Sequence, residues 1–215
     1  MPDNSAREFV TIHQALHGYR DGHRLLESSM SLSGDARSIL LTLSDMSGPS
    51  MVPGFDFYVT GYPVFEAGCY ALAATWYAPE MERPGCVWTH TLLIDFSHLA
   101  AVEDLRALQA YFVRPRLGGD FSSYQQPIAA HLDVDGPVAR FHNIPSMRLL
   151  QALYTQDDAV LCSIENAAQP LDFLLQIWSQ QWPKLRRSFK FCTGALSPRR
   201  LKAAEFDLQF FPRRN

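Results

Sequence analysis

Residues 10–29, VTIHQALHGYRDGHRLLESS, hold the densest group of side chains in this sequence that could do chemistry. The imidazoles of His13, His17 and His23 could transfer protons or bind a divalent ion. The dipeptide Asp21–Gly22 is a strong signal for a β-hairpin, because a tight type I′ turn needs positive φ at both central residues. We therefore expect the histidines on two paired strands.

Pairing about a two-residue turn at Asp21–Gly22 fixes which side chains share a face. It sets three pairs of residues opposite each other: Arg20 and His23, Tyr19 and Arg24, and His17 and Leu26. His13 and His17 then lie on one face about 13 Å apart, and His23 lies on the other face. Histidines placed in this way cannot share an ion, so we expect no metal site.

Acid–base catalysis by a histidine and a carboxylate is an alternative use of the same residues. His23 stands close to Asp21, and His90 lies in the apolar run 86–94. No serine stands in a GxSxG elbow, and the sequence has no GxxxxGK[ST] or GxGxxG loop. We therefore expect no catalytic residues and no cofactor. A small hydrolase-like enzyme with a His/Asp-centred site would need a deep pocket in which His23 or His90 meets a carboxylate and a hydroxyl.

Side chains typical of binding hot spots occur in the same part of the chain. Tyrosine, tryptophan and arginine are enriched at hot spots, and the segments 58–62 and 76–79 add aromatic residues next to loops with proline and glycine. We rank partner binding above catalysis and place the two hairpin regions at the contact surface. The residues expected near its centre are Tyr19, Arg20, Asp21, His23, Arg24 and His90.

Length and composition indicate a folded globular chain. The 215 residues suffice for a large domain, and 47% hydrophobic and 19% charged residues exclude a disordered or fibrous protein. The sequence has no run of eighteen apolar residues, and its start, MPDNSAREF, lacks the features of a secretory signal. We expect a cytoplasmic protein with no membrane span. Four cysteines stand far apart in apolar runs and are expected as free thiols: Cys69, Cys86, Cys162 and Cys192.

Charge is distributed unevenly along the chain, although the net charge is only −3. Residues 183–215 contain nine Lys and Arg and two acids, whereas residues 1–182 contain ten Lys and Arg and twenty acids. Such a basic segment suits a solvated edge of the fold, docking onto an acidic segment, or nucleic-acid binding. The alternating phenylalanines favour core-facing strands, so nucleic-acid binding is kept as a lesser alternative.

Hydrophobic patterning predicts hairpins first and alternating helices and strands later. Strands are expected at 8–18, 23–31, 55–61, 69–77, 86–94, 138–142, 159–164, 188–194 and 206–211, and helices at 35–43, 97–112, 146–155, 171–182 and, for one turn, 197–203. This order indicates an α+β fold with a mixed sheet built from early β-hairpins and α/β alternation in the C-terminal half. Residues 1–215 are expected to form a single domain, the N-terminal module of a longer protein.

Several blocks of the sequence resemble a known bacterial family. The blocks are HQALHGYRDGHRLLESS at 13–29, LSDMSG at 43–48, TGYP at 60–63, TWYAPEMERPGCVWTHTLLID at 75–95 and FCTGALSPR at 191–199. In this order they are similar to the N-terminal domain, of the first type, of bacterial GTPase-associated proteins. The resemblance extends over nearly the whole chain.

The resemblance implies a role beside a GTPase. Such domains look like the first part of longer proteins encoded next to small GTPases, in bacterial systems of conflict with phage. The resemblance implies a GTPase as the protein partner, and it brings no catalytic residue with it. An arginine from Arg20, Arg24 or Arg83 would be a chemically sensible group to accelerate GTP hydrolysis in trans. The leading hypothesis is a non-catalytic interaction and regulatory module that couples a GTPase to an effector.

Overall fold

A computed structural model of the chain describes residues 9–48, 50–132, 146–155 and 158–213. The strands are β1 (Phe9–Tyr19), β2 (His23–Ser28), β3 (Phe57–Val64), β4 (Cys69–Tyr77), β5 (Val87–Asp95), β6 (Ile128–His131), β7 (Val160–Ile164), β8 (Phe191–Cys192), β9 (Arg200–Leu201), β10 (Ala204–Glu205) and β11 (Leu208–Pro212). The helices are α1 (Gly34–Ser44), α2 (Ser146–Thr155), α3 (Leu171–Gln180) and α4 (Pro183–Ser188), with the 3-10 turns η1 (Phe65–Ala67), η2 (Leu105–Tyr111) and η3 (Ser122–Gln125).

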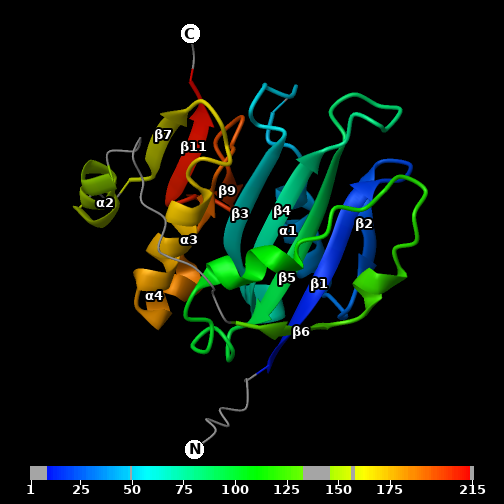
Figure 1. The fold of residues 1–215 in the computed structure, drawn as a ribbon, viewed down its shortest axis with the longest axis horizontal. Helices are drawn as coiled ribbons and strands as arrows, with labels where there is room; N and C mark the ends of the chain where they lie inside the picture. The colour runs from blue at the N-terminus through cyan, green and yellow to red at the C-terminus, as the bar shows by residue number, and fades with distance from the viewer. Residues whose placement is uncertain (1–8, 49, 133–145, 156–157, 214–215) are drawn as a thin grey trace, which may run out of the picture.

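One mixed sheet of nine strands organises the molecule (Figure 1). Its main path has the order β2-β1-β5-β4-β3-β8-β11-β7, and β6 pairs with the first part of β1. Strand β11 runs parallel to β7 and β8, whereas the pairs from β2 to β8 are antiparallel. Helix α1 covers one face of the sheet, and η2 and α3 cover the other (Figure 1). The expected α+β fold is confirmed.

The hydrophobic core is continuous from the first hairpins to the last strand. It joins Ile12 of β1 and Leu40 of α1 to Trp178 of α3 and Phe210 of β11. Burial of apolar surface across both halves couples them thermodynamically. All four cysteines are free, as expected. In the part of the chain that the structure describes, no helix has the length and apolar character needed to cross a bilayer.

The first hairpin forms as expected, but its register near the turn differs. The chain turns over three residues, with Asp21 and Gly22 at φ of 55° and 112°, and Tyr19 rather than Arg20 pairs with His23. A β-bulge in β2 then restores the expected register, so that Leu16 pairs with Glu27. The extra loop residue shifts the turn end of β2 by one position, which reverses the face of its side chains there. His23 therefore shares a face with Tyr19, and the expectation that it faces away from His17 is wrong.

Helix α1 forms where the sequence predicts it. The Ser33 hydroxyl accepts a hydrogen bond from the backbone N–H of Ala36 at 3.2 Å, which caps the helix. Leu40 and Leu43 are buried on the sheet. The loop that follows leads to β3, which continues through Gly61 and Pro63 instead of ending there. The termination of this strand at Gly61 was thus a wrong prediction.

Two other predicted helices are absent from the described residues. In place of a helix over 97–112, the chain forms turns and η2, because the carboxylates of Asp95 and Asp104 accept hydrogen bonds from the nearby backbone N–H groups of Ser97 and Arg106. In place of a helical turn at 197–203, β9 and β10 form a small hairpin. Lys202, with φ of 57°, lies in a left-handed turn that no α-helix contains. The strand expected at 138–142 lies outside the described residues.

Candidate functional site

Three separate segments meet at a pocket of about 300 Å³ at one end of the sheet. Tyr19 and His23 come from the first hairpin, 45–48 from the loop after α1, and 83–86 from the loop between β4 and β5. Antiparallel pairing of β1 with β5 and of β5 with β4 places the first hairpin turn and the loop between β4 and β5 at the same end of the strands. The pocket lining consists of Tyr19, His23, Asp45, Met46, Gly48, Arg83, Pro84, Gly85 and Cys86.

His23 is held in this pocket by the end of α1. Its Nε2 lies 2.8 Å from the hydroxyl of Ser44, and that hydroxyl donates to the carbonyl of Leu41 at 3.0 Å. The Ser44 oxygen therefore accepts from His23, which places the proton of the neutral imidazole on Nε2. Burial lowers the pKa of His23, and the carboxylate of Asp45 partly opposes this change. The Nδ1 atom of His23 has no hydrogen-bond partner among the described residues.

His17 lies directly behind His23. The two rings are stacked with their centroids 6.2 Å apart. His17 is 1% exposed, and both of its ring nitrogens are buried with no hydrogen-bond partner among the described residues. Burial, with a smaller effect of the neighbouring His23, lowers the pKa of His17 to about 3. The ring is therefore neutral at physiological pH.

A buried polar row fixes the α1 end of the pocket to the sheet. The Thr89 hydroxyl donates to the carbonyl of Ser44 at 2.6 Å and accepts from the hydroxyl of Thr75 at 2.9 Å. Next in the row, Arg199 donates to the carbonyls of Leu43 and Asp45 at 3.0 and 2.7 Å. A cation at the C-terminal end of a helix satisfies its free carbonyls and complements the helix dipole. This row sets the position of Asp45 at the pocket.

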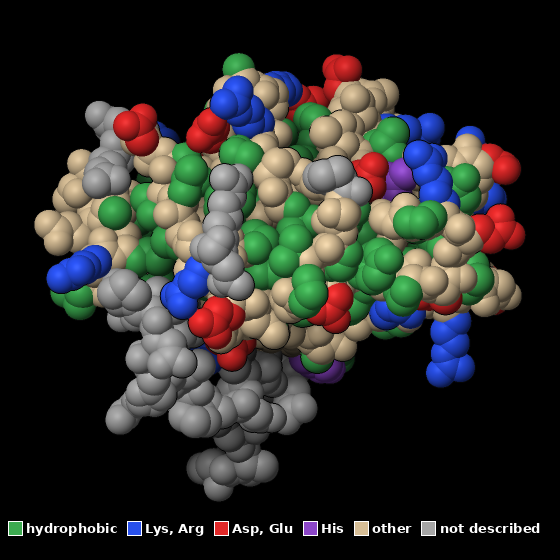
Figure 2. Space-filling model, turned by 90° about the horizontal axis from the view of Figure 1, so that it is seen from above, with side chains coloured by type: hydrophobic (Ala, Val, Ile, Leu, Met, Phe, Trp, Pro, Cys, Tyr) green, Lys and Arg blue, Asp and Glu red, His purple; other side chains and the backbone are tan. Residues whose placement is uncertain are grey.

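Three exposed arginines lie at this end of the sheet, and one of them, Arg83, lines the pocket. Arg20 and Arg24 are exposed on the hairpin, and Arg83 is exposed on the loop between β4 and β5. None of the three forms an ion pair with a described residue, and Arg20 lies 6.0 Å from the ring centroid of Phe121. Figure 2, seen from this end, shows Lys and Arg side chains next to a histidine on the side of the molecule formed by β1 and β2. This surface suits an anionic or strongly polar partner.

His90 does not belong to this surface. Its side chain is fully buried, because both faces of β5 are covered, so the expectation of an exposed contact is wrong. Its Nδ1 accepts from the backbone N–H of Val113 at 3.1 Å, and its Nε2 donates to the amide oxygen of Gln14 at 2.8 Å. Burial lowers the pKa of His90 to about 4. Gln14 in turn donates to two backbone carbonyls, so His90 is the centre of a structural network.

Among the other aromatic residues considered for recognition, several are part of the core. Tyr58 and Tyr62 of the segment 58–62 are each at most 1% exposed. Asp45 and Cys86 line the pocket but were not singled out from the sequence. The signal that could have found them is their place in LSDMSG and in the PGC of 84–86, two of the blocks quoted for the family resemblance.

The pocket lacks an activated nucleophile. Burial raises the pKa of the Cys86 thiol, so it is protonated at neutral pH. The Ser44 hydroxyl is fully buried and donates to a helix carbonyl. In the described part of the chain, no group of three or more His, Cys, Asp or Glu side chains is placed to hold a metal ion. The chemistry available here is hydrogen bonding, charge complementarity and proton exchange at His23.

Comparison with protein families finds a match in the N-terminal half of the chain. Residues 11–112 match the model of the family GTPase-associated protein 1, N-terminal domain type 1. This confirms the resemblance for that segment and supports a GTPase-related role for the chain. We call residues 11–112 the GTPase-associated segment. Every residue that lines the pocket lies within this segment. The block at 191–199, with Arg199, lies outside it.

Searches of curated proteins and of solved structures found no match.

Proposed function

We propose that the chain is an interaction module that binds a bacterial GTPase through the face around this pocket. We define the hairpin face as Tyr19, Arg20, Asp21, His23 and Arg24 of the first hairpin, together with Asp45 and Arg83. The proposed module catalyses no reaction itself. It couples the nucleotide state of the GTPase to an effector of a conflict system.

The observation that carries this proposal is the convergence of three family blocks on one pocket. The blocks at 13–29, 43–48 and 75–95 are far apart in the sequence, yet each contributes lining residues. Core packing alone does not require these exposed turns to meet, because exposed loops are under weak packing constraints. A shared contact surface is the simplest physical reason for blocks of this kind to lie together.

The charges of the hairpin face suit a partner that presents carboxylates or a bound nucleotide. Arg20, Arg24 and Arg83 have no ion-pair partner among the described residues, so they are free to pair with carboxylates of a partner. An arginine presented to a bound nucleotide also stabilises the charge that develops during phosphoryl transfer. Association should therefore be sensitive to ionic strength and to removal of these arginines.

A retention experiment with matched variants tests the proposal. The purified chain is immobilised and exposed to lysate of its source bacterium with GDP or a non-hydrolysable GTP analogue, and bound proteins are identified by mass spectrometry. We expect a GTP-binding protein whose retention depends on the nucleotide. The double variant Arg24→Ala/Arg83→Ala should weaken its binding at least about tenfold, equivalent to about 1.4 kcal/mol.

Arg148→Ala is the matched control, because Arg148 is exposed on α2 near the opposite edge of the sheet. It should leave retention unchanged. Equal retention of the GTPase by wild type and the double variant would exclude the hairpin face as the contact. Failure to retain any GTP-binding protein with either nucleotide would count against a GTPase partner.

Acid–base chemistry at His23 is a second candidate, favoured by one observation. The donation of Nε2–H to Ser44 leaves Nδ1 as an unprotonated base in the same pocket as Asp45 and Arg83. His23→Gln keeps an N–H donor for Ser44 and removes the base. Turnover of p-nitrophenyl phosphate or p-nitrophenyl acetate that is lost in this variant would establish an enzyme. If no turnover above background is detected, the result would count against acid–base catalysis at His23 and in favour of the binding role.

A further inference from the structure

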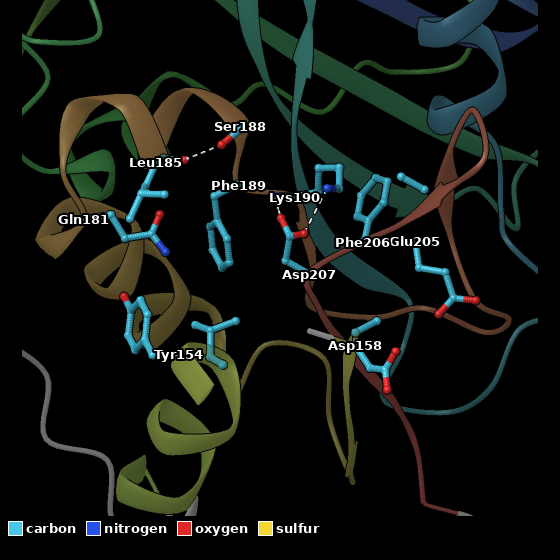
Figure 3. A pocket seen from close by; sticks show the side chains of 13 residues that line it. Tyr154, Asp158, Gln181, Leu185, Ser188, Phe189, Lys190, Glu205, Phe206 and Asp207 are labelled. Carbon is cyan, nitrogen blue, oxygen red and sulfur yellow. Dashed lines mark hydrogen bonds and ion pairs between the residues drawn. The ribbon is translucent and has the colours of Figure 1, made fainter. Parts of the chain in front are cut away.

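A second cavity, of about 570 Å³, lies at the other edge of the sheet (Figure 3). Its lining includes Asp158 and Ala159 before β7, Phe189 and Lys190 before β8, and Phe206 and Asp207 before β11. The cavity is therefore at the N-terminal ends of the three parallel strands. Ligands of open α/β sheets are usually bound at the opposite, carboxyl ends. This placement argues against a nucleotide as the ligand of this cavity.

Most charged groups around the cavity neutralise one another. Lys190 Nζ lies 2.9 Å from a carboxylate oxygen of Asp207, and Arg200 donates to Glu205 at 2.6 Å. Asp158 is exposed and forms no ion pair or hydrogen bond with a described residue. Asp158 is thus the lining carboxylate without such a partner, and it gives the cavity a local negative charge.

A second free acceptor is buried in the wall. Gln181, directly after α3, is 6% exposed, and its Oε1 has no hydrogen-bond partner among the described residues. A buried amide oxygen without a donor costs about 1–3 kcal/mol, so a ligand that supplies an N–H group gains by satisfying it. Figure 3 shows Gln181 and Asp158 on different sides of the cavity, with Phe189 between them.

The rim of the cavity is apolar and exposed. Tyr154 and Leu185 line the cavity and are 55% and 48% exposed, and Trp182, next to Gln181, is 79% exposed. Large apolar side chains this exposed are typical of contact surfaces, and Trp and Tyr are typical anchors. Phe189 and Phe206 also line the cavity but are only 5% and 0% exposed, so Tyr154 presents the accessible aromatic ring. An accessible ring of this kind attracts a planar cation.

We propose that this cavity binds a partner polypeptide that inserts an arginine side chain, with an apolar neighbour packed on the Trp182 rim. The guanidinium is a planar cation with several N–H donors, so it can pair with Asp158 and stack on the exposed ring of Tyr154. The Gln181 oxygen accepts a further N–H group of the same segment. The cavity volume is larger than one side chain and accommodates such a segment.

This proposal is independent of the hairpin face. β2 and β7 are the two ends of the strand order, and the cavity consists of residues after position 112, outside the GTPase-associated segment. Loss of one binding activity therefore need not affect the other.

Nuclear magnetic resonance titration of the ¹⁵N-labelled chain tests it with defined probes. The probes are the peptide acetyl-Leu-Arg-Leu-amide and the same peptide with citrulline, which has the shape of arginine without its charge. We expect the arginine peptide to shift the backbone amide signals of Gln181, Lys190 and Asp207, with at least tenfold higher affinity than the citrulline peptide. Asp158→Asn should remove most of this difference, and Trp182→Ala should weaken both peptides.

Asp56→Asn is the matched control, because Asp56 is an exposed acid just before β3, away from the cavity, and should leave the titration unchanged. Gln181→Leu, which preserves volume without the acceptor, should weaken arginine-peptide binding without loss of folding. Equal affinity for the arginine and citrulline peptides would overturn the proposal. So would signal shifts away from the cavity, or binding unaffected by Asp158→Asn.

Discussion

Three histidines of this chain show how environment decides the role of a residue. His17 and His90 are both fully or almost fully buried, but only His90 has hydrogen-bond partners among the described residues for its ring nitrogens. His23 is half-buried at the pocket and can exchange a proton with bound molecules. Residue type alone made all three candidates for function, whereas burial separates two structural rings from one accessible ring.

The two buried histidines should make stability depend on pH. Their pKa values are about 3 for His17 and about 4 for His90, below the ordinary value of 6.5 that applies in the unfolded chain. Above pH 6.5 the folded and unfolded states are both neutral at these sites, so there is no effect. As pH falls below 6.5 the unfolded state takes up protons that the folded state excludes, which lowers stability by about 2 kcal/mol per histidine at pH 5.

Urea unfolding at pH 7 and pH 5 measures this effect. His17→Leu should reduce the number of protons that the chain takes up on unfolding near pH 5 by about one, because it removes one of the two buried imidazoles. The same variant should also be at least as stable as wild type at pH 7, since it eliminates a buried polar ring without partners. A variant with undiminished pH dependence would show that His17 is not excluded from protonation in the folded state.

At the scale of elements, the first hairpin depends on close contact with β5. Gly18 of β1 lies against Trp88, and a Cβ added at Gly18 would be 2.4 Å from two ring carbons of this tryptophan. Both residues lie between the hairpin turn and the core, so their contact sets where the hairpin face is held. The absence of a side chain at Gly18 is thus a packing requirement.

Gly18→Ala should destabilise the protein by about 3 kcal/mol, because the Trp88 ring must move out of a packed cluster. Gly34→Ala is the matched control. Gly34 is at the start of α1, and an added Cβ there meets nothing within 4 Å, so alanine should be neutral or stabilise by up to about 1 kcal/mol. Thermal unfolding of both variants measures the difference. Equal melting temperatures would show that β1 can shift away from Trp88 at little cost.

At the scale of the whole molecule, Arg199 connects the C-terminal part to the GTPase-associated segment. Its side chain is buried at the end of α1, where it donates to Leu43, Asp45 and the hydroxyl of Tyr58. The pocket wall thus depends on a residue more than 100 positions away in the sequence. This contact gives a physical reason to treat residues 1–215 as a single domain, which remains a prediction.

Arg199→Leu should destabilise the whole chain by about 3 kcal/mol, because it leaves buried carbonyls without donors. Arg200→Leu is the matched control, because Arg200 is exposed and its ion pair with Glu205 should contribute less than about 1 kcal/mol. Urea unfolding followed by tryptophan fluorescence and by far-ultraviolet circular dichroism measures both. Coincident transitions are expected for a single domain. Two separate transitions would instead show that the halves fold independently.

The basic segment 183–213 uses most of its charges within the fold. Arg186 donates to the backbone carbonyls of Gln181 and Val102, Arg187 lies 4.2 Å from the ring centroid of Phe96, and four others form ion pairs with acids. These four are Lys190, Arg200, Lys202 and Arg213. Residues already paired contribute less to binding phosphates. Nucleic-acid binding was kept as an alternative from sequence, and this arrangement gives it no further support.

The sequence by itself determined the features that depend on local chemistry. The Asp21–Gly22 turn, the Ser33 cap of α1 and the alternating hydrophobic strands follow from backbone preferences and side-chain periodicity, which act over a few residues. The same local patterns carried the resemblance to the GTPase-associated family. They also placed Tyr19 and His23 in the segment that forms the pocket.

Only the tertiary structure decided which of these residues act together. The third loop residue of the first hairpin moved His23 to the face of His17, and burial of both faces of β5 removed His90 from the surface. Strand pairing across the sheet brought Asp45 and Arg83 to the same pocket. These outcomes depend on burial and on contacts between residues distant in the chain, and local preferences carry no information about either.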